Sequence, residues 1–275
     1  MNPLVSVIMA TYNRANLAGR AIQSVIDQNF SDWELIVVND ASSDNTKDVL
    51  EEWEKKDKRI KVVNNEKNVW QSEGVAGNLR RGIALSSGKY IARIDDDDYW
   101  TDKNKLKKQI DFLKNHKDYV LCGTGVIVED EYGKEIFRYL KREQDNEIRE
   151  KALFANPFTH STVLFLKTAY DKAGGYGNLK LAEDWDLWLK LGRIGKFYNL
   201  PEYSIRYLAD RGSYSFIYQR AQSKLILKII KSHRKNYPNF YPAYLLNYLQ
   251  YLYSFLPAAI KKPLHAALSR IKRSI

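Results

Sequence analysis

Residues 4–40, which read LVSVIMATYNRANLAGRAIQSVIDQNFSDWELIVVND, contain two runs of strand length on either side of a run with helical spacing. Residues 4–10 and 33–39 are rich in β-branched side chains, as strands are. Between them, apolar residues in 16–28 recur at steps of three and four, the period of a helix with one buried face. A strand, a helix and a second strand with short connections predict a βαβ unit with parallel strands.

The same alternation continues towards residue 100. Further strands are expected at 59–65 and 90–94, and further helices at 44–56 and 74–86. This pattern predicts an α/β fold with a Rossmann-like, mostly parallel central sheet flanked by helices. After Trp100 we expect a helix at 102–115, strands near 118–128 and 162–167, and a helix over 182–191.

The composition excludes several classes of protein. The chain has 275 residues, 44% of them apolar, which is enough to bury a large core. Its one cysteine, Cys122, excludes an intrachain disulfide, and the first residues lack the pattern of a secretion signal, so we expect a cytoplasmic protein. The net charge of +11 comes from residues 216–275, which hold eleven Lys or Arg and no acid. Removing these eleven from the total of 44 leaves 33 basic residues, which balance the 33 acidic ones.

Polar side chains follow three of the expected strands where the strands end. These segments are TYNR (11–14), NDASSDN (39–45) and DDDD (95–98). In open parallel sheets ligands bind outside the carboxyl ends of the strands, so we expect these segments to line a site. Neither a G-x-G-x-x-G loop nor a Walker loop follows the first strand, which disfavours a dinucleotide or P-loop site. Bound phosphate would instead need the aspartates together with a divalent cation.

The four aspartates at 95–98 have two interpretations. Mg²⁺ and Mn²⁺ prefer oxygen ligands, and Mg²⁺ typically combines one or two carboxylates with phosphate oxygens. In an extended segment alternate residues point the same way, so Asp95 and Asp97 would face one pocket, and Asp96 and Asp98 another. The alternative is a solvated acidic turn that caps the next helix. The position at the end of a central strand favours a metal or ligand site.

Three segments are also open to a structural interpretation. Asp40 could accept hydrogen bonds from a base or ribose, or belong to a turn, and Tyr12 could stack on a base or pack against the sheet edge. In LAEDWDLWLKL (181–191), acids at the start of a helix suit its dipole. A carboxylate beside Trp185 would also be partly desolvated, which raises its pKa and suits a general base.

In order and spacing, four segments resemble the motifs of the family 2 glycosyltransferases, which have the GT-A fold. They are VSVIMATYNR (5–14), ELIVVNDASSDNT (34–46), GNLRRGIALSSGKYIARIDDDDYW (77–100) and LAEDWDLWLKLGRIGKFYNLPE (181–202). The resemblance covers about residues 3–215 and implies transfer of a sugar from a nucleotide-diphosphate donor, with inversion at the anomeric carbon. It also implies Mn²⁺ or Mg²⁺ as cofactor and a single carboxylate as base.

The resemblance implies a role for each residue of the nucleotide-binding loops. Tyr12 would stack on the base, with Thr11 and Asn13 in the same loop, and Asp40 would hold the base or ribose. His160 lies in a segment that resembles one near the acceptor, although a lone histidine in an apolar setting is commonly structural.

The acidic segments carry the remaining roles that the resemblance implies. Asp97 would be a metal ligand, and Asp95 and Asp96 would contact the ribose or the metal. Asp184 would deprotonate the acceptor hydroxyl, and Glu183 would contact the acceptor. Where many members have a histidine that approaches the metal, this chain has Asp210, which leaves a third protein ligand unassigned.

Residues 216–275 are expected to form basic amphipathic helices. An aromatic stripe at steps of three or four consists of Tyr237, Tyr241, Tyr244, Tyr248, Tyr251 and Phe255. Pro242 and Pro257 interrupt an uncharged stretch and leave fewer than the roughly 20 residues that a membrane span needs. Aromatic and basic side chains together favour an anionic membrane surface. The alternative is that the stripe packs onto the rest of the protein, and nucleic acid is disfavoured because no recognised module accompanies the charge.

These features predict a catalytic domain at 1–215, with a nucleotide-binding half at 1–100 and an acceptor-binding half at 101–215, followed by a tail at 216–275. The expected protein is a metal-dependent glycosyltransferase on the cytoplasmic face of the cell membrane. It would use a UDP sugar and a saccharide or lipid-linked saccharide acceptor in bacterial surface polysaccharide synthesis.

Two other classes of protein are alternatives to the transferase. A non-catalytic protein that keeps the fold and binds a nucleotide or a membrane is the main alternative. A nucleotidyltransferase is disfavoured because it would need a glycine-rich, lysine-bearing loop where this chain has MATYNRANL (9–17).

Overall fold

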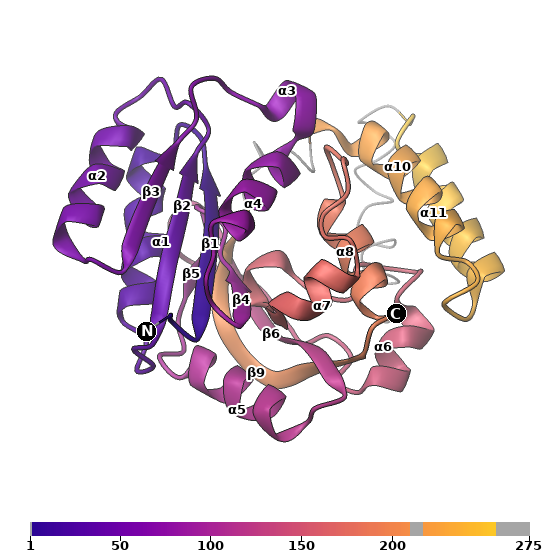
Figure 1. Ribbon diagram of the computed structural model, residues 1–275. Helices are drawn as coiled ribbons and strands as arrows, with labels where there is room; N and C mark the ends of the chain where they lie inside the picture. The colour runs from indigo at the N-terminus through magenta and orange to yellow at the C-terminus, as the bar shows by residue number, and fades with distance from the viewer. Residues whose placement is uncertain (1, 210–216, 257–275) are drawn as a thin grey trace.

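The computed structural model describes residues 2–209 and 217–256 (Figure 1). Its strands are β1 (Val5–Thr11), β2 (Trp33–Asn39), β3 (Ile60–Asn64), β4 (Tyr90–Arg93), β5 (Tyr99–Trp100), β6 (Tyr119–Glu129), β7 (Glu135–Tyr139), β8 (Leu164–Leu166) and β9 (Lys196–Leu208). Its helices are α1 (Ala15–Ile26), α2 (Thr46–Lys56), α3 (Trp70–Glu73), α4 (Val75–Ala84), α5 (Lys105–Asn115), α6 (Asp145–Lys151), α7 (Lys167–Lys172), α8 (Glu183–Leu191), α10 (Gln219–Ser232) and α11 (Phe240–Tyr253), with a 3₁₀ turn, η1 (His160–Thr162). Within the described residues the strands form one sheet in the order β3-β2-β1-β4-β8-β6-β9-β5, and β7 pairs with β6.

The first half of the sheet is parallel and consists of the strands that the sequence predicts. β3, β2, β1 and β4 pair side by side, and every residue of β2 is buried because helices cover both faces. On one face α1 and α2 cover side chains such as Val7 and Leu35, and on the other α4 covers Ile8 and Ile36 (Figure 1). Alternate strand residues point to opposite faces, which gives this half a hydrophobic core on each side. The predicted α/β architecture is confirmed.

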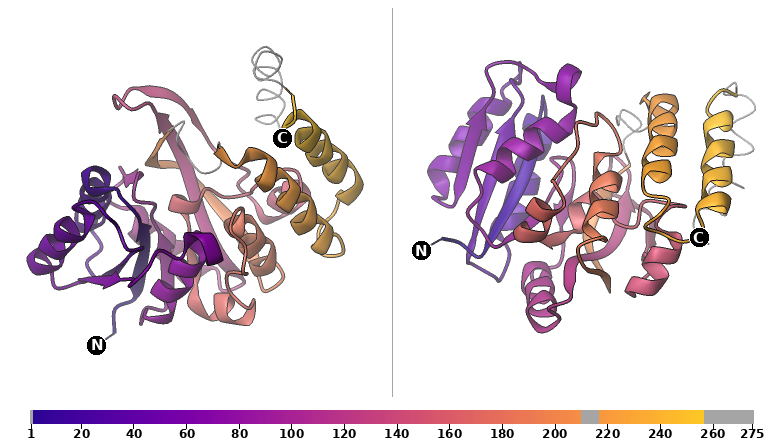
Figure 2. Two further views of the ribbon diagram at one scale, coloured as in Figure 1. Left: turned by 90° about the horizontal axis from the view of Figure 1, so that it is seen from above. Right: turned by 45° about the vertical axis from the view of Figure 1, so that its right-hand side comes forward.

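The second half of the sheet is mixed. β8 is antiparallel to β4 and to β6, β9 is parallel to β6, and β5 is antiparallel to β9. The strands predicted near 118–128 and 162–167 are β6 and β8. The helix predicted at 102–115 is α5, which begins later, at Lys105, because the Asp102 carboxylate accepts a hydrogen bond from the N–H of Asn104 in a turn. The sequence pattern does not predict β7 or β9, and the β6–β7 hairpin projects from the body (Figure 2).

The helices α10 and α11 form a hairpin beside α8 (Figure 2). One face of this hairpin packs onto the body, where Leu227 and Ile230 are buried in a cluster with Trp185 of α8. Tyr237 donates a hydrogen bond to the backbone oxygen of Leu189, again in α8. For the described residues, the interpretation in which part of the tail packs onto the rest of the protein is therefore correct.

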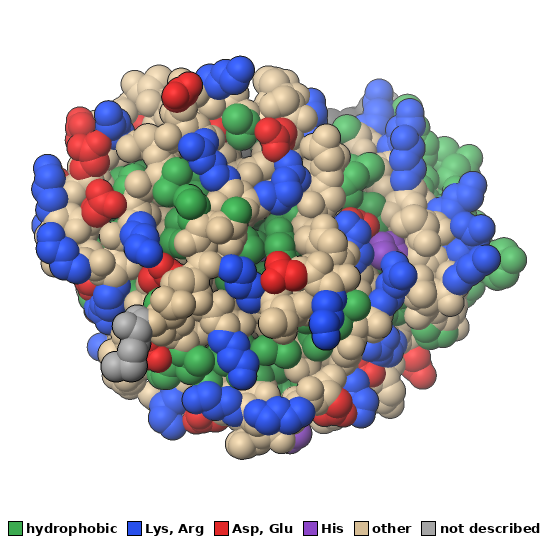
Figure 3. All heavy atoms as spheres, viewed as in Figure 1, with side chains coloured by type: hydrophobic (Ala, Val, Ile, Leu, Met, Phe, Trp, Pro, Cys, Tyr) green, Lys and Arg blue, Asp and Glu red, His purple; other side chains and the backbone are tan. Residues whose placement is uncertain are grey.

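Another face of the hairpin is exposed. Its exposed apolar side chains on α11 are Tyr241, Leu245, Tyr248, Leu249 and Leu252, and its exposed basic side chains on α10 are Arg220, Lys224, Lys228 and Lys231. Basic and hydrophobic atoms lie together over the hairpin in the space-filling view (Figure 3). Among the helices described, none is both long enough and apolar enough to cross a membrane.

Candidate active site

A cavity of about 730 Å³ lies at the carboxyl ends of β1, β2 and β4 and extends to the start of α8. All nine residues that the sequence assigns to the site lie on its wall: Thr11, Tyr12, Asn13, Asp40, Asp95, Asp96, Asp97, Glu183 and Asp184. The first seven meet because parallel strands end at one edge of the sheet. The hairpin contributes Ile217, Gln222, Ile226 and Gln250 to the same cavity.

The loop after β1 is tied to the loop after β2 by Asn13. Its Oδ1 accepts a hydrogen bond from the backbone N–H of Ser43 at 2.8 Å, and its own N–H donates to Ser42 Oγ at 3.0 Å. Asn13 has a φ of 53°, a left-handed conformation that asparagine tolerates. Thr11 is buried at the end of the strand, whereas Tyr12 is 38% exposed, so its ring is available for stacking.

Asp40, at the end of β2, is buried and holds the segment that leads into α3. Its Oδ1 accepts hydrogen bonds from the N–H of Val69 at 2.9 Å and from Asn65 Nδ2 at 2.8 Å. An ionised carboxylate offers about four acceptor positions, so these two bonds leave capacity for a ligand. A structural role and a ligand contact are therefore compatible at this residue.

The aspartates do not continue β4. The N–H of Asp98 donates to the backbone oxygen of Asp95 at 3.2 Å, which closes a turn with Asp96 and Asp97 at its centre. The alternation expected for an extended segment is therefore wrong, because Asp95, Asp96 and Asp97 all line the cavity. The Asp98 side chain is buried and accepts a hydrogen bond from Ser161 Oγ, so it does not cap α5.

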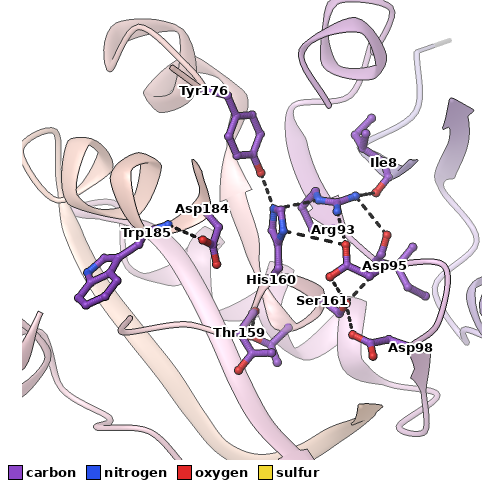
Figure 4. Close-up of polar contacts among 12 residues, drawn as sticks. Ile8, Arg93, Asp95, Asp98, Thr159, His160, Ser161, Tyr176, Asp184 and Trp185 are labelled. Atoms are coloured by element: carbon purple, nitrogen blue, oxygen red, sulfur yellow. Dashed lines mark hydrogen bonds and ion pairs between the residues drawn. The ribbon is translucent and has the colours of Figure 1, made fainter. Parts of the chain in front are cut away.

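Arg93, the last residue of β4, places a positive charge inside this cluster (Figure 4). Its side chain is fully buried, with Nη2 2.6 Å from Asp95 Oδ1 and Nε 3.1 Å from His160 Nε2. Burial raises the pKa of Asp95, but the charge of Arg93 and the hydrogen bonds from Ser161 and Arg93 act together against burial, and the pKa is lowered. Burial and Arg93 together lower the pKa of His160 to about 3, so His160 is neutral and its Nε2 accepts the Arg93 hydrogen bond.

Asp96 and Asp97 form the part of the cluster that fits a divalent cation. Burial and the charge of Asp97 raise the pKa of Asp96 to about 7, so a cation beside Asp96 would stabilise its ionised form. Over residues 2–209 and 217–256, no three His, Cys, Asp or Glu side chains form a metal site by themselves. The donor set therefore fits a cation shared between one or two carboxylates and substrate phosphate oxygens. Asp210 lies outside the described residues.

Glu183 and Asp184 begin α8 and form a second pair of buried carboxylates. Burial, followed by the charge of Asp184, raises the pKa of Glu183 to about 8. Burial also raises the pKa of Asp184, although its Oδ1 accepts a hydrogen bond from the N–H of Trp185 at 2.7 Å and its Oδ2 one from Asn156 Nδ2 at 2.6 Å. A carboxylate whose pKa is raised towards neutral is suited to accept a proton.

Asp186, the third acid of this helix, does not take part in the cavity. Its carboxylate lies 2.7 Å from Lys190 Nζ and 3.1 Å from His233 Nε2. Burial raises its pKa, but the bonds to His233 and Lys190 outweigh burial and lower it. Since His233 follows α10, Asp186 connects α8 to the hairpin.

Sequence reasoning missed Arg93, Asn156 and the four hairpin residues of the cavity. The signal for Arg93 is an arginine inside an apolar run directly before four aspartates, since a buried charge needs a partner. Asn156 lies 28 residues from Asp184 and carries no local signal. The sequence pattern does not predict that the hairpin residues line the cavity, because it divides residues 216–275 from the catalytic domain.

The sheet, the acidic turn after its central strand and the acidic pair on α8 together define a GT-A type of glycosyltransferase. Residues 6–174 match the model of the family described as Glycosyl transferase family 2, and the chain belongs to this family.

Known proteins agree with this assignment. EpsE of Bacillus subtilis (strain 168), classed by its name among glycosyltransferases, is 32% identical over 271 residues, which are 96% of this chain and 93% of EpsE. WfgD of Escherichia coli, named as a UDP-Glc:alpha-D-GlcNAc-diphosphoundecaprenol beta-1,3-glucosyltransferase, is 40% identical over 125 residues, 45% of this chain and 47% of WfgD. The mannosyltransferase PcManGT of Pyrobaculum calidifontis, solved with GDP-Man and Mn²⁺, has the same fold, with a TM-score of 0.68 at 18% identity over 98% of this chain and 81% of PcManGT.

Proposed function

We propose that this protein is an inverting glycosyltransferase that moves a sugar from a UDP-linked donor to an acceptor hydroxyl. One observation carries the proposal: Asp95–Asp97 and the Glu183–Asp184 pair line one cavity. In the close-up, Asp184 and Asp95 lie on either side of His160 (Figure 4). The donor diphosphate would bind at the first group and the acceptor at the second.

The donor nucleotide would bind at the ends of β1 and β2. Tyr12 is exposed enough to stack on the base, and Asp40 has acceptor capacity left for a base or ribose. Thr11 and Asn13 would shape this loop, since Asn13 fixes it to the loop after β2. The name of WfgD, which includes UDP-Glc, supports UDP as the nucleotide.

Asp97, together with Asp95 or Asp96, would hold Mn²⁺ or Mg²⁺ with the donor phosphates. When bound, such an ion offsets the charge that develops on the departing diphosphate. Arg93 keeps Asp95 ionised and therefore able to contact the ribose or the cation. The complex of PcManGT with GDP-Man and Mn²⁺ supports a divalent cation that accompanies the nucleotide sugar.

Asp184 would be the base. Its ionised carboxylate accepts the proton of the acceptor hydroxyl while that oxygen forms a bond to the anomeric carbon. The bond from this carbon to the diphosphate oxygen breaks, and the nucleoside diphosphate leaves with the electron pair. A single displacement inverts the configuration, so an α-linked donor gives a β-linked product. Glu183, protonated at pH 7 because its pKa is raised to about 8, would hydrogen-bond the acceptor.

We also propose a lipid-linked saccharide as acceptor, in bacterial surface polysaccharide synthesis at the cytoplasmic face of the membrane. The name of WfgD, which includes a diphosphoundecaprenol acceptor, supports this class. The basic and apolar face of the hairpin would lie on anionic lipid, so that residues 1–215 act as the catalytic domain and 216–275 as the membrane-associating tail. The hairpin would then stand between the lipid surface and the acceptor side of the cavity.

Thermal-shift measurements with nucleotides and nucleotide sugars, with and without Mn²⁺, test this function. We expect stabilisation by UDP and UDP sugars only when Mn²⁺ is present, and loss of this stabilisation in Asp97→Asn. Incubation of the stabilising donor with GlcNAc-diphosphoundecaprenol and related lipid acceptors would then release UDP. Nucleotide binding without turnover on any acceptor would favour the non-catalytic alternative, and stabilisation by no nucleotide would contradict both.

A further inference from the structure

Asn156 forms a hydrogen bond to Asp184, the proposed base, but the mechanism proposed above gives Asn156 no role. It lies between α6 and η1, on the wall of the cavity, and its Nδ2 donates to Asp184 Oδ2 at 2.6 Å. Hydrogen bonds to ionised groups are typically shorter and stronger than neutral ones, and this distance is in that range. The bond joins two parts of the chain that are 28 residues apart.

The Asn156 side chain is itself held in one orientation. Its Oδ1 accepts a hydrogen bond from the N–H of Phe158 at 3.3 Å, and Lys141 Nζ donates to its backbone oxygen at 2.6 Å. An N–H on one side and a carboxylate on the other decide which end of the amide faces which partner. The amide N–H therefore points at Asp184.

This arrangement leaves the base free to react. One hydrogen bond to each oxygen, from Trp185 N–H and from Asn156, uses about two of the four acceptor positions of the carboxylate. The two donors fix the plane of the carboxylate, and the remaining positions can accept the acceptor hydroxyl. Without Asn156, Asp184 Oδ2 would lose the partner that fixes its side-chain rotation.

We propose that Asn156 is the positioning residue of the Asp184 carboxylate and holds it in the orientation that receives the acceptor proton. The proposal rests on the proposed function, because it assumes that Asp184 is the base. The same hydrogen bond stabilises the charged form of Asp184 and lowers its pKa, against burial, which raises it.

Other charged or titratable groups also act on Asp184 and have to be separated from Asn156. Asp95, after β4, raises the pKa of Asp184, and Lys141, after β7, lowers it. Two neighbours respond to Asp184 in turn. Burial raises the pKa of Glu183, in the same helix, and of Tyr176, in the segment before α8, and the charge of Asp184 raises both further. All four groups are retained in Asn156→Ala and in the isosteric Asn156→Asp, so a change common to both variants reports on the donated hydrogen bond.

The first test needs no substrate. The protein is labelled with ¹³C at the aspartate carboxyl carbons, the Asp184 signal is assigned by its absence in Asp184→Asn, and its titration is followed by NMR. We expect the Asp184 titration to move to higher pH in Asn156→Ala, and further in Asn156→Asp, which adds a like charge. Asn29→Ala, which removes an exposed asparagine hydrogen bond to Asn104, should leave it unchanged. An unchanged Asp184 titration in both Asn156 variants would overturn the proposal.

The second test uses turnover of UDP-glucose on GlcNAc-diphosphoundecaprenol, or of whichever donor and lipid acceptor the wild type uses. At pH 7 we expect kcat to fall about 10- to 100-fold in Asn156→Ala, as for loss of a hydrogen bond to a charged group, with the donor KM within twofold. Part of the loss should be recovered at higher pH, where Asp184 ionises. An equal loss at every pH would identify a merely structural role. If the wild type turns over no donor, the proposed function fails, while the NMR titration still decides what Asn156 does to Asp184.

Discussion

Asp95 and Asp184 are both carboxylates on the wall of one cavity, but they have different partners. Asp95 is paired with the fully buried Arg93 guanidinium at 2.6 Å, and its pKa is lowered. Asp184 is held by the amide of Asn156 and the N–H of Trp185, which are neutral, and its pKa is raised. A buried cation keeps the first carboxylate charged, as cation or ribose binding requires. Burial raises the pKa of the second one although its neutral donors lower it, and a raised pKa makes a carboxylate a stronger base.

The largest effect is expected from the base. Asp184→Asn keeps the shape of the side chain and removes its ability to accept a proton, so transfer should fall about 10²- to 10⁴-fold. Donor binding uses the other group of carboxylates, so the thermal shift with UDP and Mn²⁺ should persist. Asp171→Asn, an exposed change on α7, is the control. Full transfer by Asp184→Asn would remove Asp184 from the mechanism, and loss of nucleotide binding would show that the two groups are not separate.

The next largest effect is on stability. Arg93→Met leaves Asp95 without its cation and also removes the hydrogen bond that Arg93 Nη1 donates to the backbone oxygen of Ile94. We expect the free energy of unfolding in urea to fall by about 3 kcal/mol, as when one partner of a buried ion pair is removed. Arg138→Met breaks an exposed pair with Glu135 and should cost less than about 1 kcal/mol. Equal losses in the two variants would mean that Arg93 is not the charge that the aspartate cluster needs.

Glu183 and Asp95, one from each group of carboxylates, should also respond to pH with opposite sign. Glu183 has a pKa of about 8 in the folded protein against an ordinary value of 4.5, so the folded state binds more protons between these values. Its contribution to stability therefore falls as pH rises from about 5 to 8. Glu183→Gln removes this loss, and we expect the variant to be more stable than wild type by at least about 1 kcal/mol at pH 8.5, with the difference vanishing near pH 4.5.

Asp95 provides the opposite case. Its folded pKa lies below the ordinary value of 3.8, so its contribution is present above pH 4 and is lost as pH falls through the folded value. Asp95→Asn should therefore be less stable than wild type at pH 7, in the same urea measurements. If Glu183→Gln and Asp95→Asn change the free energy of unfolding in the same direction at pH 8, the contrast between Glu183 and Asp95 is wrong.

The sequence predicts the parallel half of the fold well, and the residues that it assigns to a site line one cavity. Strands such as 33–39 and helices such as 16–28 follow from local periodicity, and the topology of parallel strands then places their polar ends at one edge. The local pattern does not predict β9, because Pro201 lies within it and a proline in a sequence argues against a central strand. Its long pairing with β6, which lies far away in the chain, makes it a strand.

The electrostatics of the site could not be predicted from local patterns. The sequence contains four adjacent aspartates. Three of them line the cavity and Asp98 does not, because a turn directs the Asp98 side chain to Ser161. Arg93 and Asp95 are near neighbours in sequence, yet the burial that gives their pairing its strength comes from β8 and η1. Asn156 meets Asp184 only through the packing of the second half of the sheet.

The smallest effect concerns the exposed face of the hairpin. Unlike the two groups of carboxylates, this face does not line the cavity and is open to solvent. Leu245 is 59% exposed and Leu249 is 53% exposed on α11, which contacts α10, the helix that carries the exposed basic side chains. If this face lies on anionic lipid, Leu245→Asp and Leu249→Asp should each weaken binding to phosphatidylglycerol vesicles about tenfold, because each removes apolar burial and adds a repelled charge. Binding is measured by co-sedimentation, with phosphatidylcholine vesicles as the uncharged comparison.

The chain offers a matched control for this experiment. Leu85, after α4, is 52% exposed and is not part of the hairpin, so Leu85→Asp adds the same charge at a similar exposure on another element. Vesicle binding that is unchanged by Leu85→Asp and lowered by both hairpin variants would place the lipid contact on α11. Equal binding by all three variants would leave the hairpin with its other observed roles, packing on α8 and lining the cavity through Gln222 and Ile226. Salt should weaken the binding of the wild type, because part of it comes from lysines such as Lys224 near the headgroups.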